Sequence, residues 1–125
     1  MSAGDALIWV VAAMFAGVGV AGLVAPARVL AIFGVTVGTA DGRSEVRAVY
    51  GGFGIAVAAV LGVAAAGGGE AREGILVAIG VAAAGMAAGR LLARAVEPPS
   101  GFWPVWFWLW VEAAMGVALL CAAWA

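Results

Sequence analysis

Long apolar runs separated by short polar breaks make up almost the whole chain. The runs cover residues 6–25, 45–66, 74–96 and 102–124. Each is close to the roughly 20 apolar residues that an α-helix needs to cross about 30 Å of hydrocarbon. Proline or glycine ends the first three runs, at Pro26, at Gly67–Gly69 and at Pro98–Pro99. The pattern therefore predicts four transmembrane helices in a single domain of residues 1–125.

The connection between the first two runs carries a further apolar segment, from Arg28 to Phe33, which ends at Gly34. A segment of this length predicts one or two turns of interfacial helix, with Arg28 among the lipid headgroups. Residues 36–42 then read as a turn, with Asp41 or Ser44 as N-cap of the second span. The expected fold class is an all-α integral membrane four-helix bundle with a short interfacial helix between spans one and two.

Composition agrees with a membrane protein and removes several kinds of chemistry. Hydrophobic residues make up 66% of the chain and charged residues 10%, far from the balance of soluble domains. The net charge of −1, with no lysine, makes nucleic acid an unsuitable partner. The absence of histidine excludes imidazole-ligated haem and zinc, and the single Cys121 excludes an internal disulfide. We expect no cofactor and no metal.

The arginines lie mostly on one side of the predicted bundle. Five of them lie in or near the first and third connections: Arg28, Arg43, Arg47, Arg90 and Arg94. Only Arg72 lies near the second connection. The positive-inside rule therefore predicts that connections one and three face the cytoplasm and that both termini lie outside.

A few ionisable side chains interrupt the apolar spans, where each costs about 2.5–3.5 kcal/mol to insert. The second span contains Glu45, Arg47 and Tyr50, the third Arg90, and the fourth Glu112. All lie in one half of the membrane or at its middle, and an Arg90–Glu112 pair is within reach. We therefore expect these side chains to point into the bundle and to line one polar pocket that opens toward connections one and three.

Structural interpretations of the same residues remain open. Glu45 also suits the first turn of a helix, where the dipole favours an acid. Arg47 and Arg90 could be structural bridges to backbone carbonyls or to Glu112. Trp108, in a tryptophan-rich segment, either walls the pocket beside Glu112 or belongs to interfacial and packing aromatics. The glycines within the spans predict close helix contacts, and they include Gly17, Gly22, Gly54, Gly62, Gly80, Gly85 and Gly89.

The run from Arg43 to Gly52 reads RSEVRAVYGG. It resembles the (N/S)-E-x-R-A-x-Y-G-G signature of small four-helix bacterial membrane proteins grouped as domain-of-unknown-function family 4345. The Gly89–Arg90 pair and Glu112 fit the same pattern, whereas Ser44 stands where asparagine is more frequent. The resemblance implies a four-helix fold over nearly the whole chain and a bacterial inner membrane. It implies no activity.

The residues favour a membrane-embedded site for a lipophilic small molecule with one polar end. Apolar walls would surround the body of the molecule, and Arg47, Arg90 and Tyr50 would hold an oxygen-rich head, with Trp108 alongside. If the site is catalytic, Glu112 is the candidate proton donor or acceptor and Glu45 the alternative. Acid–base isomerisation, cyclisation or epoxide opening would fit these groups.

The alternative hypothesis is a structural or accessory subunit of a larger membrane complex, in which the charges neutralise one another. Self-association as a homo-oligomer is a related expectation, and membrane lipid is a partner under either hypothesis. A transporter is a weaker third option, because four helices are few for alternating access and no span is broken at its centre.

Overall fold

A computed structural model describes residues 1–125, and every regular element in it is helical. The elements are α1 (Ala3–Val24), α2 (Pro26–Ala31), α3 (Ala40–Val46), the π-helical turn η1 (Arg47–Gly52), α4 (Phe53–Ala65), α5 (Ala71–Val96), the π-helical turn η2 (Phe102–Trp106) and α6 (Phe107–Ala123). Because α3, η1 and α4 run on without a break, four helices are long and apolar enough to cross a membrane. The predicted all-α membrane bundle is confirmed.

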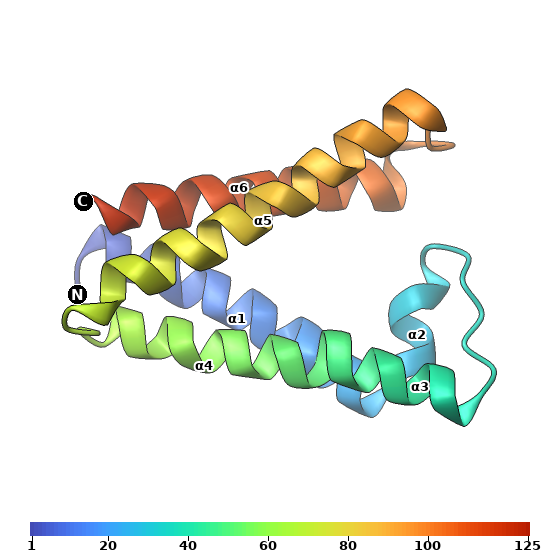
Figure 1. The fold of residues 1–125 in the computed structure, drawn as a ribbon, viewed down its shortest axis with the longest axis horizontal. Coiled ribbons are helices and arrows are strands. Elements are labelled where there is room, and N and C mark those ends of the chain that lie inside the picture. The colour runs from blue at the N-terminus through green and yellow to red at the C-terminus, as the bar shows by residue number, and fades with distance from the viewer.

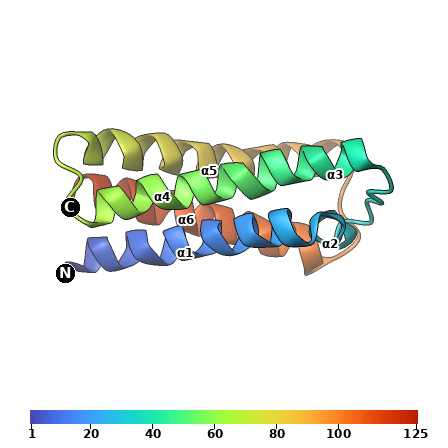
Figure 2. The ribbon, with the colours of Figure 1, turned by 90° about the horizontal axis from the view of Figure 1, so that it is seen from below.

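The four long helices form two hairpins (Figure 1). In the first hairpin α1 lies along η1 and α4, and in the second α5 lies along α6. Both chain termini and the α4–α5 connection lie at one end, which we call the terminal end; α2, its loop and the α5–α6 connection lie at the other (Figure 2). The hairpins meet at the terminal end and diverge toward the other, which we call the open end (Figure 1). Connections one and three thus share one end, as predicted.

The core lies near the terminal end and draws on every long helix. Four large side chains are fully buried there: Ile8 of α1, Leu61 of α4, Leu76 of α5 and Leu119 of α6. Burial of apolar side chains against lipid-like surroundings brings little hydrophobic gain, so close contact and small residues hold membrane helices together.

Glycine allows the closest of these approaches. A Cβ atom added at Gly22 of α1 would lie 2.7 Å from the backbone nitrogen of Gly51, and one at Gly54 would lie 2.9 Å from Cα of Gly19. In the second hairpin a Cβ at Gly80 would lie 3.0 Å from Leu120. At these positions the prediction of close helix contact is confirmed.

Gly17, Gly85 and Gly89 make no such contact within the chain, because an added Cβ would meet nothing within 4 Å. These glycines lie on helix faces turned away from the rest of the chain. Helix α5 instead packs through a different stripe, which includes Leu76, Gly80 and Ala83. Spacing alone does not say which face of a helix meets its neighbour.

The helix ends differ from the predicted ones by a few residues because local caps extend them. Helix α1 begins at Ala3, since Ser2 and Asp5 form a reciprocal capping box. Helix α3 begins at Ala40, capped by the Thr39 side chain, which accepts from the Gly42 backbone N–H. The expectation of Asp41 or Ser44 as the cap was therefore wrong. The short helix in the first connection is confirmed as α2.

Candidate ligand site between the hairpins

The site begins with the predicted ion pair between the second hairpin's two helices. Arg90 of α5 donates from Nε to Oε2 and from Nη2 to Oε1 of Glu112 of α6, both at 2.7 Å. Glu112 is only 5% exposed, and it is the buried charged residue of the bundle. A bidentate guanidinium–carboxylate pair is among the strongest polar contacts in proteins, so it fixes the orientation of Arg90.

Arg90 also lines a cavity of about 240 Å³ at the open end. The other polar side chains in its wall are Arg28 of α2, Tyr50 of η1 and Trp108 of α6. Phe33, which follows α2, lies over the Arg90 guanidinium with 5.6 Å between the carbon Cζ and the ring centroid. This distance is within the range of a cation–π contact, which joins the α2 segment to the second hairpin.

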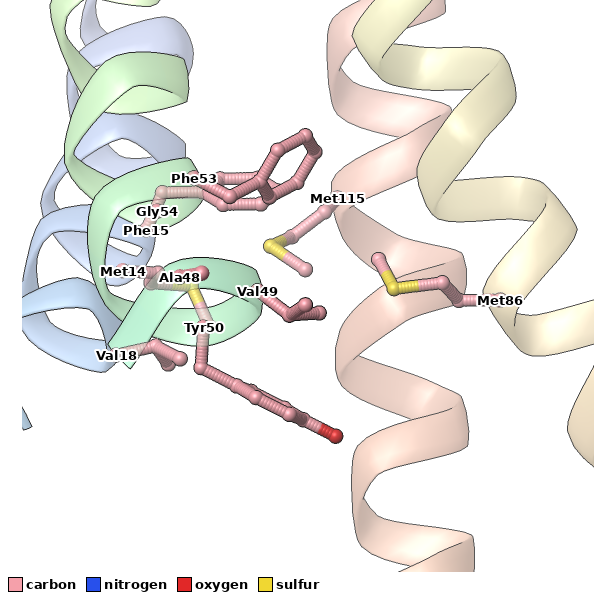
Figure 3. Close-up of a pocket in the computed structure, with 10 residues that line it drawn as sticks. All are labelled: Met14, Phe15, Val18, Ala48, Val49, Tyr50, Phe53, Gly54, Met86 and Met115. Carbon is pink, nitrogen blue, oxygen red and sulfur yellow. The ribbon is translucent and has the colours of Figure 1, made fainter. Parts of the chain in front are cut away.

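Tyr50 connects this small cavity to a larger one. Its ring extends from η1 toward α6, with the hydroxyl at the far end (Figure 3). The side chain is 37% exposed, and the structure gives its hydroxyl no hydrogen-bond partner. Tyr50 and Val18 are walls of both cavities, so the two spaces adjoin. Tyr50 lies on a π-helical turn, a rare conformation that occurs often at functional sites.

The larger cavity has a volume of about 540 Å³ and an almost wholly apolar wall. The first hairpin contributes Met14, Phe15, Val18, Ala48, Val49, Tyr50, Phe53 and Gly54, and the second contributes Met86 and Met115. Figure 3 shows these two methionines pointing toward the first hairpin across the space. Methionine is flexible and polarisable, so such a wall adapts to different hydrophobic shapes.

Arg47 does not join the predicted pocket. Its Nε donates to the backbone carbonyl of Leu23 at 3.1 Å, near the C-terminal end of α1, and it lines none of the cavities described. Terminal carbonyls of a helix lack intrahelical donors, and an arginine satisfies one here. A regular helix would give Arg47 and Tyr50 a common face, but the π-helical turn between them widens the spacing.

The two carboxylates proposed for proton transfer lie apart from the larger cavity. Both oxygens of Glu112 accept hydrogen bonds from Arg90, and Glu112 lines neither of these two cavities nor the third one described next. Glu45 is exposed and lines a third cavity of about 430 Å³, formed largely by the loop between α2 and α3. Tyr50 borders that cavity as well.

Trp108 and Arg28 complete the polar wall. Nε1 of Trp108 is buried and has no hydrogen-bond partner, which is costly for an indole N–H. Arg28 was expected among the headgroups, and sequence reasoning missed its place at the cavity. The signal available was its position on a short helix that begins at Pro26, where the first span ends.

Comparison with known protein families gives one match. The model described as "Domain of unknown function (DUF4345)" matches residues 5–123. The chain belongs to this family. The match confirms the resemblance carried by the run from Arg43 to Gly52, and it includes all the site residues described above. No curated protein and no solved structure matches the chain. Because the family description assigns no activity, a function has to be argued from the site itself.

Proposed function

We propose that this membrane protein binds a lipophilic small molecule with one oxygen-bearing polar end between its two hairpins. The observation that carries the proposal is that an apolar cavity adjoins a smaller cavity whose wall adds two arginines to apolar side chains. The cavity of about 540 Å³ is apolar, and its neighbour of about 240 Å³ has Arg28, Arg90 and Trp108 in its wall. Ligand sites in proteins typically combine mostly apolar walls with a few polar groups that orient the ligand.

The Arg90–Glu112 pair supports binding more than it supports catalysis. A proton donor must reach the reacting atom within hydrogen-bond distance. Glu112 bonds Arg90 through both oxygens and borders none of the three cavities, whereas Glu45 borders only the loop cavity. We therefore restrict the proposal to binding, with Arg90 as the group that contacts the ligand and Glu112 as the residue that positions it.

A blocking substitution tests the proposal. Met86 is 43% exposed and lines the larger cavity, so Met86→Trp should fill space without disturbing the core. Leu92→Trp, on the same helix at a position 69% exposed and outside the three cavities, is the matched control. The probe is hexadecanol, and native mass spectrometry of the protein in mild detergent counts the bound molecules. Binding should fall at least fivefold in Met86→Trp and stay unchanged in Leu92→Trp. Equal binding by the two variants would contradict the proposal.

A second function, as a subunit of a larger membrane assembly, is favoured by one observation. Gly85 and Gly89 lie one turn apart on α5 and have no neighbour on that face. Small residues at this spacing are typical of contacts between membrane helices. Replacing both by Leu should reduce the particle size on native gels if the face holds a partner, and it should leave hexadecanol binding intact. An unchanged size would remove this alternative.

We propose that the open end faces the cytoplasm, because Arg28 of α2, Arg43 of α3 and Arg47 of η1 belong to elements at that end and the positive-inside rule applies to such clusters. Cysteines introduced at Ser100 and at Glu70, in a Cys121→Ser background, would report the two ends. A membrane-impermeant maleimide should label Glu70→Cys in intact cells and Ser100→Cys only after permeabilisation. The reverse result would invert the orientation.

A further inference from the structure

We infer that the polar end of the bound molecule is an acid, carried as a carboxylate or phosphate, and that Arg28 and Arg90 hold it. The inference rests on the proposed function and specifies its ligand class. It also changes the sequence hypothesis, because Arg28 takes the place given to Arg47.

The charge balance of the smaller cavity is the first reason. Its wall contains two guanidinium groups, from Arg28 and Arg90. One carboxylate, that of Glu112, neutralises Arg90. Arg28 forms no ion pair and no side-chain hydrogen bond with any residue of the chain. One positive charge is therefore left over at the cavity, and a single negative charge on a ligand would balance it.

The donor and acceptor balance is the second reason. Arg90 donates one N–H from Nε and one from Nη2 to Glu112, which leaves the two N–H groups of Nη1 and the second one of Nη2 without a protein partner. The Tyr50 hydroxyl also has no partner, whereas the unpaired indole N–H of Trp108 is enclosed by protein atoms and is not counted as a donor to the ligand. Both oxygens of Glu112 are occupied. The wall thus contains unused donors on its arginines and on Tyr50 and no carboxylate, which suits a head group made of acceptors, as in a carboxylate or phosphate.

The third reason is the position of the charge relative to the apolar space. Arg28 is exposed at the open end, whereas the larger cavity reaches Met115 of α6, within the bundle. Tyr50 and Val18 border both spaces. An amphiphile would therefore lie with its hydrocarbon body between the hairpins and its acidic head near the membrane surface, where a charge costs least.

A matched pair of probes separates charge from hydrophobicity. Palmitate and hexadecanol share a hydrocarbon chain and differ in the head, and binding of each is measured by native mass spectrometry at an alkaline pH that ionises the carboxyl. The variants are Arg28→Gln and, as control, Arg43→Gln, which removes a positive charge at the same end outside the three cavities. Because Arg28 is exposed and unpaired, its exchange should not disturb folding.

The expected result is that the native protein prefers palmitate over hexadecanol. Arg28→Gln should weaken palmitate binding about tenfold, the loss of one charge-assisted contact, and leave hexadecanol binding unchanged. Arg43→Gln should change neither. Equal binding of both probes by the native protein, or an equal effect of both substitutions on palmitate, would overturn the inference but keep the proposed function. Failure of both probes to bind would overturn the proposed function as well.

Competition identifies the source of the acid. If phosphatidylglycerol added to the detergent displaces palmitate from the native protein, the head group belongs to a bilayer lipid. If palmitate stays bound, the ligand is a single-chain acid. Both outcomes support recognition of an acidic head, provided that Arg28→Gln weakens binding of the acid that prevails.

Discussion

The two ends of the bundle differ in which helices their polar contacts connect. At the terminal end Arg72 of α5 reaches across to the first hairpin. Its Nη1 lies 2.9 Å from an Asp5 carboxylate oxygen of α1 and donates to the Ala64 carbonyl of α4 at 2.6 Å. The fully buried side chains of all four long helices lie near this end. Polar contacts and core thus hold the two hairpins together there.

At the open end the polar contacts stay inside each hairpin. Arg47 bonds the Leu23 carbonyl within the first, and Arg90 bonds Glu112 within the second. The contact of Phe33 with the Arg90 guanidinium crosses between them. Each end has one arginine in an ion pair, but only Arg72 of the terminal end pairs across the two hairpins. The comparison teaches that the choice of arginine partner, within or between hairpins, decides where apolar space remains for a ligand.

The largest effect is expected from Glu112→Gln, which separates a positioning role from a proton-transfer role. The exchange keeps the shape but leaves the Arg90 guanidinium without its charge partner in the bundle. Breaking a buried ion pair from one side costs about 3 kcal/mol or more. We expect a clear loss of thermal stability in detergent, measured by scanning fluorimetry, together with weaker palmitate binding.

A double variant provides the control for that prediction. Arg90→Gln combined with Glu112→Gln removes both charges, so it should recover most of the lost stability while palmitate binding stays weak. If Glu112→Gln alone leaves stability unchanged, then Glu112 does not neutralise Arg90. That result would favour the hypothesis that Glu112 donates or accepts a proton.

A smaller effect is expected within the first hairpin from Gly22→Ala. Its new methyl group would lie 2.7 Å from the Gly51 backbone nitrogen, so α1 and η1 would have to separate. Overpacking of this kind costs about 2 kcal/mol. Gly17→Ala, on the open face of the same helix, is the matched control and should cost nothing, since alanine favours helix. Equal melting temperatures for both variants would show that the hairpin is not held by glycine contact.

The sequence predicts the spans and the Arg90–Glu112 pair because both follow from simple constraints. Run length determines where a helix can cross the bilayer. Their positions along two neighbouring helices then place Arg90 and Glu112 at a similar depth in the membrane. An isolated charge is costly there, so pairing of the two side chains is favoured. Sequence reasoning therefore found this pair within reach, and the structure shows it at 2.7 Å.

The cavities and the place of Arg47 were not predictable in the same way. A common face for Arg47 and Tyr50 requires a regular angular spacing along the second span, and the π-helical turn at Arg47–Gly52 breaks that spacing. The cavities exist because the two hairpins diverge toward the open end, and no single residue determines the angle between them. The same holds for Gly85 and Gly89, since their open surroundings depend on the rotation of α5.

Weakening the terminal end should have a moderate effect, because Arg72 and Asp5 are partly solvated. Arg72→Gln removes the ion pair and the bond to Ala64, and we expect a loss of about 1 kcal/mol. Arg43→Gln, which removes an arginine that makes no ion pair, should leave the melting temperature unchanged. A greater loss from Arg43→Gln than from Arg72→Gln would mean that the open end contributes more to stability than its contacts suggest.

The smallest effect on stability, under about 1 kcal/mol, is expected from Phe33→Leu, which removes the cation–π contact between the α2 segment and Arg90. Its effect on the distance between the two hairpins should be easier to detect. Nitroxide labels at Thr36 and Ser100, in a Cys121→Ser background, report the separation of the hairpins at the open end. Labels at Ala66, which follows α4, and at Ala125, which follows α6, report it at the terminal end. Loss of the ring should broaden the distance distribution between the first two labels and leave that between the second two unchanged. Palmitate should narrow the open-end distribution of the native protein, since a ligand that contacts both hairpins restrains them. Equal broadening at both ends would mean that the hairpins loosen along their whole length, and the contrast between the two ends would then be lost.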